Sequence, residues 1–211
     1  MIEELLPAGV RAAEVFDDEL PVELFPEEAA LMAGSSERRR RQFASVRGCA
    51  RRALGELGVA PVPLLRGKNG APRWPEGVVG SMTHCRGYRA AVVARAEHLA
   101  AVGIDAEPAL PLPEGVLGLV TGPEERDMLA RLPGRAPLDR VLFCAKEALY
   151  KAWFPLTQTW AGFRDAAVEI EPGGGFAARM LLDASGRAPE VFRGRWSVRE
   201  GLILTVVTVA R

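Results

Sequence analysis

The chain is poor in cysteine and carries no excess charge. Its 211 residues include only three cysteines, an odd number with no Cys-x-x-Cys spacing. This excludes a disulfide framework and the common zinc-binding patterns. Basic and acidic residues are equal in number, 27 of each, and only two tyrosines are present. A chain without excess positive charge or many aromatic side chains lacks the surface that nucleic-acid binding requires, so we expect no nucleic-acid partner.

Long hydrophobic runs are also missing. Apolar residues make up 48% of the chain, but no apolar stretch approaches the roughly 18 residues that span a membrane. The first residues, MIEELLPAGV, carry acids where a signal peptide would carry Lys or Arg. We therefore expect a globular cytoplasmic protein that does not enter a membrane. Its length allows one large domain or two small ones, with a core that needs no disulfides.

The pattern of apolar residues predicts helices followed by strands in each half of the chain. The expected elements are a strand near 10–16, a helix capped by Ser35 or Ser36 and ending near Leu57, an antiparallel meander of strands at 78–84, 89–95 and 99–107, a helix from about 138 that is broken by Pro155, and four strands after about 165 with a hairpin turn at Glu200-Gly201. The fold class is therefore α+β. We expect two similar lobes, residues 1–106 and 107–211, each a small antiparallel sheet with packed helices.

The helix expected from about residue 138 contains the stretch FCAKEALYKAW at 143–153, which carries charged residues among apolar neighbours. Glu147 and Lys151 are four residues apart and share a face of the helix. Lys146 lies about 100° around it, so both ammonium groups can flank the carboxylate. An ordinary solvated ion pair would give the same pattern. A second acidic pair, Asp105 and Glu107, favours a functional site over a solvated ion pair. Side chains alternate between the two faces of a strand, so both carboxylates lie on one face at the strand's end.

Asp105, Glu107 and Glu147 together form a set of hard oxygen ligands that suits Mg²⁺, with Mn²⁺ as the alternative ion. Basic residues beside such an ion neutralise phosphate charge, which points to chemistry on a diphosphate. A Mg²⁺-dependent phosphohydrolase acting on a nucleotide or diphosphate would use the same ligands. This alternative stays open.

A run of arginines, Arg38 to Arg41, opens the first long helix. Positive charge at a helix N-terminus opposes the helix dipole, so the run does not serve helix stability. It forms either a solvated basic face or a site where one or two guanidinium groups bind an anionic ligand. Further along this helix, Arg51 and Arg52 offer charge complementarity to an acidic partner helix.

Two segments, GIDAE at 103–107 and FCAKEALYK at 143–151, resemble the paired signature of the 4′-phosphopantetheinyl transferases, Gly-Ile/Val-Asp-x-Glu and Trp/Phe-x-x-Lys-Glu-x-x-x-Lys. The similarity is to the longer, monomeric group that includes the Sfp-type and enterobactin-synthetase-like enzymes. Segments such as GSMTHCRGYRAAVVA and RGRWSVREGLILT look like the actinobacterial branch. The resemblance runs from about Arg38 to the C-terminus.

This resemblance implies a reaction as well as a fold. A serine of an acyl or peptidyl carrier protein attacks the β-phosphate of coenzyme A, takes 4′-phosphopantetheine and releases adenosine 3′,5′-bisphosphate. The site would lie in the cleft between the lobes. Carrier proteins of this kind serve polyketide, non-ribosomal peptide, siderophore and lipid synthesis, and the enzyme would act as a monomer.

The resemblance also assigns roles to residues. Asp105, Glu107 and Glu147 would hold Mg²⁺, and Glu147 would take the serine proton directly or through a water. Lys146 and Lys151 would stabilise the diphosphate and the leaving group. The remaining predicted coenzyme A contacts are Arg39, Arg47, Arg66, Lys68 and His84.

Overall fold

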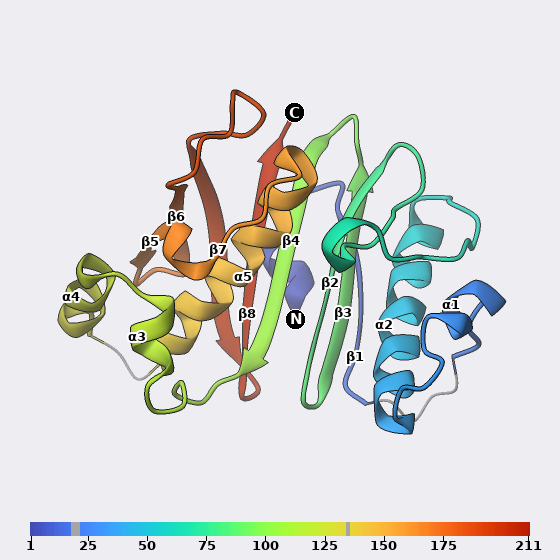
Figure 1. Cartoon of the computed structure of the whole chain (residues 1–211), viewed down its shortest axis with the longest axis horizontal. Coiled ribbons are helices and arrows are strands. Elements are labelled where there is room, and N and C mark those ends of the chain that lie inside the picture. The colour runs from blue at the N-terminus through green and yellow to red at the C-terminus, as the bar shows by residue number, and fades with distance from the viewer. Residues whose placement is uncertain (18–21, 134–135) are drawn as a thin grey trace.

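The structure is a computed structural model that describes residues 1–17, 22–133 and 136–211. Two antiparallel sheets stand side by side, and each is covered by one long helix (Figure 1). The helices are α1 (Pro26–Ala30), α2 (Glu37–Glu56), α3 (Val116–Val120), α4 (Pro123–Arg131) and α5 (Leu138–Thr157), with 3₁₀ turns η1 (Ile2–Leu5), η2 (Lys68–Gly70) and η3 (Phe163–Asp165). The strands are β1 (Arg11–Val15), β2 (Val78–Cys85), β3 (Tyr88–Arg95), β4 (Leu99–Pro108), β5 (Ala166–Glu171), β6 (Gly175–Met180), β7 (Val191–Arg199) and β8 (Leu202–Ala210).

The first lobe consists of the sheet β1-β3-β2 and helix α2. Ser36 caps the helix as predicted, because its side chain accepts a hydrogen bond from the backbone N–H of Arg39. The apolar face of α2 is buried against the sheet through residues that include Cys49, Ala50, Ala53 and Leu54. This leaves the arginine-rich N-terminal turn of α2 at the edge of the lobe.

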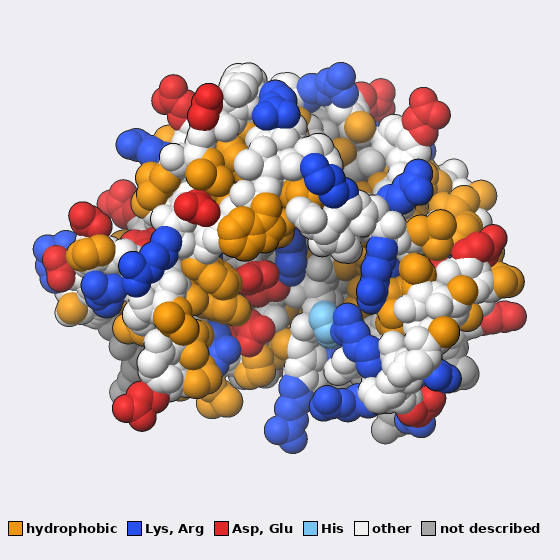
Figure 2. Space-filling model, viewed as in Figure 1, with side chains coloured by type: hydrophobic (Ala, Val, Ile, Leu, Met, Phe, Trp, Pro, Cys, Tyr) orange, Lys and Arg blue, Asp and Glu red, His pale blue; other side chains and the backbone are white. Residues whose placement is uncertain are grey.

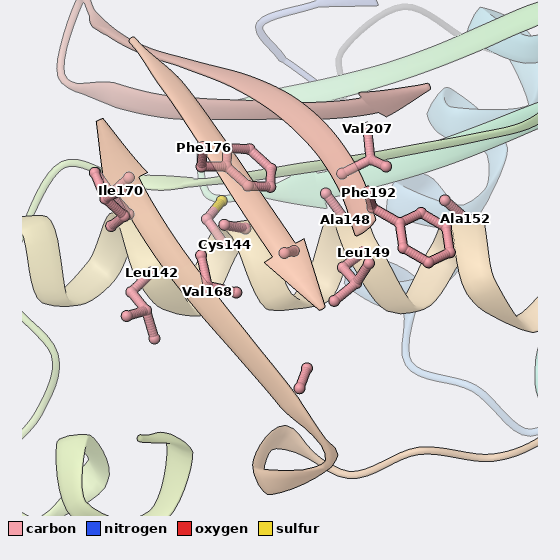
Figure 3. Packing of buried hydrophobic residues seen from close by; sticks show 14 of the residues in the cluster. Leu142, Cys144, Ala148, Leu149, Ala152, Val168, Ile170, Phe176, Phe192 and Val207 are labelled. Carbon is pink, nitrogen blue, oxygen red and sulfur yellow. The ribbon is translucent and has the colours of Figure 1, made fainter. Parts of the chain in front are cut away.

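The second lobe consists of the sheet β4-β8-β7-β6-β5 and helix α5. Figure 3 shows the helix lying against the strands, with Ala148, Leu149 and Ala152 pointing into a cluster that also contains Phe176 and Phe192. The sequence predicted that Pro155 breaks this helix, and that prediction is wrong. α5 continues two residues beyond the proline, to Thr157. Proline removes the one hydrogen bond that its own N–H would donate, and here the helix ends within a turn of that loss.

The predicted meander of three strands is also wrong in its last member. β4 pairs with β8 along its whole length and belongs to the second sheet. β3 offers it no free edge, because β1 and β2 already occupy both sides of β3. The α+β fold with two lobes is confirmed, whereas the boundary between residues 106 and 107 stays a prediction.

The two sheets meet where β2 lies beside β4, and side-chain hydroxyls bridge this seam. Ser81 accepts a hydrogen bond from the backbone N–H of Ile104 at 3.0 Å, and Thr83 accepts one from Ala106 N–H at 3.1 Å. All four residues are buried. The seam thus satisfies buried backbone donors of β4 without a backbone ladder between the sheets.

β4 and α5 approach closely at Gly103. A Cβ atom built on this glycine would lie 2.0 Å from the carbonyl oxygen of Ala148 and 2.7 Å from the backbone nitrogen of Ala152. Only glycine permits such an approach of strand and helix backbones. The contact fixes the helix that carries Glu147 against the strand that carries Asp105.

Candidate active site

A cavity of about 760 Å³ opens between the lobes. Its walls come from α2, from the loop around η2, from β2 and from the C-terminal half of α5. Figure 2 shows acidic side chains on one side of the hollow and a row of basic side chains facing them, with a histidine between. Seven of the predicted site residues line the cavity: Arg39, Arg47, Arg66, Lys68, His84, Glu147 and Lys151.

Asp105 lies behind the side of the cavity that Glu147 and Lys151 form, and it is almost fully buried. Its Oδ1 accepts hydrogen bonds from Lys151 Nζ at 2.7 Å and from the Thr83 hydroxyl at 3.0 Å, and its Oδ2 accepts one from the Cys144 thiol at 3.1 Å. Lys151 also donates to the carbonyl of Ile104 at 2.9 Å. The structure therefore pairs Asp105 with Lys151, a contact that the sequence did not predict, since it placed Lys151 beside Glu147.

Glu107, two residues further along β4, is paired with a residue that the sequence analysis missed. Arg140 donates to Glu107 Oε2 at 3.0 Å and to the carbonyls of Leu110 and Pro111 at 3.1 and 2.9 Å. Arg140 precedes Glu147 by seven residues, two turns of helix, so both lie on one face of α5. That spacing could have identified Arg140 as a neighbour of the site.

The three carboxylates influence one another. Burial raises the pKa of Glu147, and the charges of Asp105 and Glu107 raise it further, while Lys151 lowers it. Burial and the charge of Asp105 likewise raise the pKa of Glu107 against the opposing effect of Arg140. Carboxylates that repel one another in a half-buried site have the donor chemistry that a divalent cation would stabilise. In their donor chemistry, though not in their present arrangement, these side chains therefore suit a Mg²⁺ ion.

As they stand, however, the carboxylates are not gathered around one point. Within residues 1–17, 22–133 and 136–211, no three His, Cys, Asp or Glu side chains lie closely enough to hold a metal ion. Asp105 and Glu107 each point to a cation of the protein, Lys151 and Arg140.

The basic wall is formed from the first lobe. Arg39 Nη1 lies 2.8 Å from His84 Nε2. Desolvation and the positive charge of Arg39 lower the pKa of His84, so the ring is neutral and accepts this bond at neutral pH. Arg47 is buried, stacks on the Phe43 ring with 3.4 Å between guanidinium carbon and ring centroid, and burial lowers its pKa to about 10. It thus stays protonated at neutral pH and can supply charge to an anion.

Lys68 reaches across the cavity from the first lobe to the second. Its Nζ donates to the carbonyl of Gln158, just beyond the end of α5, at 3.3 Å. Arg66 lies on the same loop with its guanidinium carbon 5.7 Å from the Phe43 centroid. Both predicted residues therefore sit where they can reach an anionic ligand in the cavity.

Lys146 is the predicted site residue that the structure places elsewhere. Only 3% of the residue is exposed, and Nζ lies 2.8 Å from each of four acceptors: Glu125 Oε2 and the carbonyls of Val120, Phe163 and Ala166. All donors of its ammonium group are used by these contacts, which lie on the side of α5 away from the cavity. The prediction that it flanks Glu147 beside Lys151 is therefore wrong, and we leave Lys146 out of the proposed site.

We expect Lys146→Met to destabilise the fold without weakening coenzyme A binding. Removing the ammonium leaves the buried Glu125 carboxylate unpaired, which costs about 3–5 kcal/mol of unfolding free energy. Urea denaturation measures this loss, and calorimetric titration at a temperature where the variant is folded measures coenzyme A affinity. The matched control is Lys68→Met, an exposed lysine over the cavity, for which we expect near-normal stability and weaker binding. Weakened binding by a stable Lys146→Met would return this lysine to the site.

In one cavity between the two α+β lobes, Glu147 and Lys151 lie opposite a row of basic side chains, an arrangement suited to an anionic, phosphate-bearing ligand. Two family models match the chain: the 4′-phosphopantetheinyl transferase N-terminal domain over residues 27–94, and the 4′-phosphopantetheinyl transferase superfamily over residues 101–207. The chain therefore belongs to the 4′-phosphopantetheinyl transferases.

Individual relatives agree with the family models. 4′-Phosphopantetheinyl transferase Svp of Streptomyces mobaraensis is 50% identical over 220 residues, which cover 100% of this chain and 89% of the relative. 4′-Phosphopantetheinyl transferase PptT of Mycobacterium tuberculosis is 49% identical over 97% of this chain and 98% of its own length. Enterobactin synthase component D of Salmonella typhimurium is 29% identical over 84% of the chain and 75% of its own. None of these comparisons supports the phosphohydrolase alternative.

Proposed function

We propose that this transferase moves 4′-phosphopantetheine from coenzyme A to a serine of acyl or peptidyl carrier proteins, in the cavity between the lobes. The main observation in support of this proposal is that oppositely placed side chains line the two sides of the cavity. Glu147 and Lys151 face Arg39, Arg47, Arg66, Lys68 and His84 across one cavity. In this proposal the phosphates of the nucleotide bind along the basic side, and its diphosphate lies toward Glu147.

Asp105, Glu107 and Glu147 would hold Mg²⁺, or Mn²⁺ in its place. When bound, the ion supplies Lewis-acid polarisation of the diphosphate and neutralises part of its charge. The proposal is supported by the donor chemistry of the three side chains and by their mutual repulsion, described above.

The protein's own side chains account for the proton and the leaving group. The serine Oγ forms a bond to the β-phosphorus as the bond from that phosphorus to the α-phosphate oxygen breaks. The serine proton passes to the Glu147 carboxylate, directly or through a water. A carboxyl whose pKa is raised by burial is a better base than an exposed one. Lys151 neutralises charge that develops on adenosine 3′,5′-bisphosphate as it leaves.

We also propose that the enzyme acts as a cytoplasmic monomer without a nucleic-acid partner. Both walls come from one chain, so no second copy is needed to complete the cavity. In the part of the chain that the structure describes, no helix combines the length and the apolar character needed to cross a membrane. The net charge of zero gives no general attraction to nucleic acid. The carrier proteins of polyketide, non-ribosomal peptide, siderophore and lipid synthesis are the proposed substrates.

The proposal predicts a covalent change in an apo carrier protein. Incubation with coenzyme A, Mg²⁺ and this enzyme should add the mass of one phosphopantetheine group, and EDTA should prevent the addition because the ion is removed. Intact-mass spectrometry measures both. A carrier whose acceptor serine is replaced by alanine is the control. Release of inorganic phosphate with no change in any carrier would contradict the proposal.

A further inference from the structure

Thr83 has no role in the proposed chemistry, yet its hydroxyl contacts the site from the neighbouring lobe. It lies on β2, is 3% exposed, and accepts a hydrogen bond from Ala106 N–H across the seam. The same hydroxyl donates to Asp105 Oδ1 at 3.0 Å. One side chain therefore holds both the backbone of β4 and the carboxylate that β4 presents.

The other two donors to Asp105 are less able to fix its orientation. Lys151 also has a second hydrogen bond, to the Ile104 carbonyl, but it donates from the end of a flexible four-carbon stem and its side chain is 27% exposed. The Cys144 thiol is a weak donor. Threonine is branched at Cβ, which restricts its first side-chain torsion, and this one is clamped by a second hydrogen bond. Thr83 is thus the rigid contact among the three.

We propose that Thr83 is a positioning residue that orients the Asp105 carboxylate for the metal ion. His84, the next residue on β2, belongs to the basic side of the cavity, so the same strand carries a basic-side residue and the residue that holds Asp105. This role rests on the proposed metal set of Asp105, Glu107 and Glu147. Partners that orient a ligating carboxylate contribute about 10–100-fold to metal affinity.

Thr83→Val keeps the shape of the side chain and removes its hydrogen bonds. We expect the dissociation constant for Mn²⁺ to rise about 10–100-fold. Mn²⁺ is titrated into the protein with bound coenzyme A, and the free ion is measured by electron paramagnetic resonance against a sample without protein. Coenzyme A affinity measured in EDTA should stay near that of the wild type, because the valine leaves the basic wall intact.

Ser81 offers a matched control on the same strand. Ser81→Ala leaves Ile104 N–H without its partner, as Thr83→Val leaves Ala106 N–H, but Ser81 bonds no carboxylate in the described structure. We expect both variants to lose stability and only Thr83→Val to lose metal affinity. Thr83→Ser, which retains the hydroxyl, should restore most of that affinity.

The outcomes separate the two levels of the proposal. Equal metal affinity in Thr83→Val and wild type, or an equal loss in Ser81→Ala, would overturn the role of Thr83 and leave the metal set in place. A wild-type protein that transfers phosphopantetheine but binds no Mn²⁺ would overturn the metal set itself, and the role of Thr83 with it.

Discussion

Glu147→Gln should lower the rate of phosphopantetheine transfer by about a thousandfold while the protein stays folded. Glutamine keeps the size of the side chain but cannot accept the serine proton, and a positioned base typically contributes a factor of about 100 to 10,000. It also removes one proposed metal ligand. Single-turnover transfer to an apo carrier protein, followed by intact mass, measures the rate.

The same substitution should stabilise the metal-free protein above the acidic range. The pKa of Glu147 is raised on folding, chiefly by burial. The folded state therefore binds the proton more tightly than the unfolded state, and wild-type stability falls as pH rises from the ordinary glutamate pKa through the raised one. Glutamine has no charge to lose, so at neutral pH in EDTA the variant should melt at a higher temperature. A lower melting temperature for Glu147→Gln than for the wild type would show that the charged carboxylate is stabilised by the protein without a metal.

Glu56→Gln is the matched control for both measurements. Glu56 is an exposed glutamate in the last turn of α2. Its neutralisation should leave transfer and melting temperature near their wild-type values, because exposed charges contribute little. A comparable loss of transfer in this control would mean that charge in general, and not the base at position 147, limits the rate.

Gly103→Ala should be among the most destabilising single substitutions in the chain. Its methyl group would overlap the backbone of α5 at Ala148 and Ala152, neither of which can move as a side chain would. Overpacking that displaces backbone costs about 3 kcal/mol or more. Urea denaturation followed by fluorescence should show this loss. The helix that carries Glu147 and Lys151 would also be pushed away from Asp105, so transfer should fall even in the fraction that stays folded.

Gly55→Ala provides the comparison. Gly55 lies in the last turn of α2, and in the described part of the chain no atom beyond its neighbours in the helix comes within 4 Å of a Cβ built there. Alanine is favoured over glycine by about 0.5–1 kcal/mol in a helix interior and by less in a last turn, so this variant should gain a little stability. If Gly103→Ala were as stable as Gly55→Ala, the close contact of β4 and α5 would not be what requires a glycine in the GIDAE segment.

Local structure was predictable from the sequence where local chemistry decides it. The serine cap of α2 and the hairpin at Glu200-Gly201 both occur as expected, and both turn residues have positive φ, 48° and 76°. The sheet to which β4 belongs was not predictable in the same way. Its partner, β8, lies about 100 residues away, and a short link to β3 suggests a hairpin unless one knows that β1 fills the other edge of β3.

The site also combines features that the local sequence predicts with features that depend on distant parts of the chain. The predicted basic residues Arg39, Arg47 and Arg66 line one cavity with Glu147 and Lys151, whereas the pairing of Lys151 with Asp105 was not predicted. Lys146 and Lys151 are chemically identical, however, and helix periodicity alone does not say which one meets a buried carboxylate from elsewhere. Glu125, on α4, decides that Lys146 is internal. The spacing of Arg140 from Glu147 could have placed it near the site, but nothing in the sequence shows that its partner is Glu107.

The seam between the sheets has a consequence for how the protein can change over evolutionary time. Adhesion along a backbone ladder is nearly independent of sequence, because every residue except proline offers the same groups. Here the lobes share a buried hydrophobic cluster, and the hydrogen bonds across the seam come from the hydroxyls of Ser81 and Thr83. A change of one amino acid at either position therefore alters how firmly the two halves hold together, without touching the internal ladders of either half.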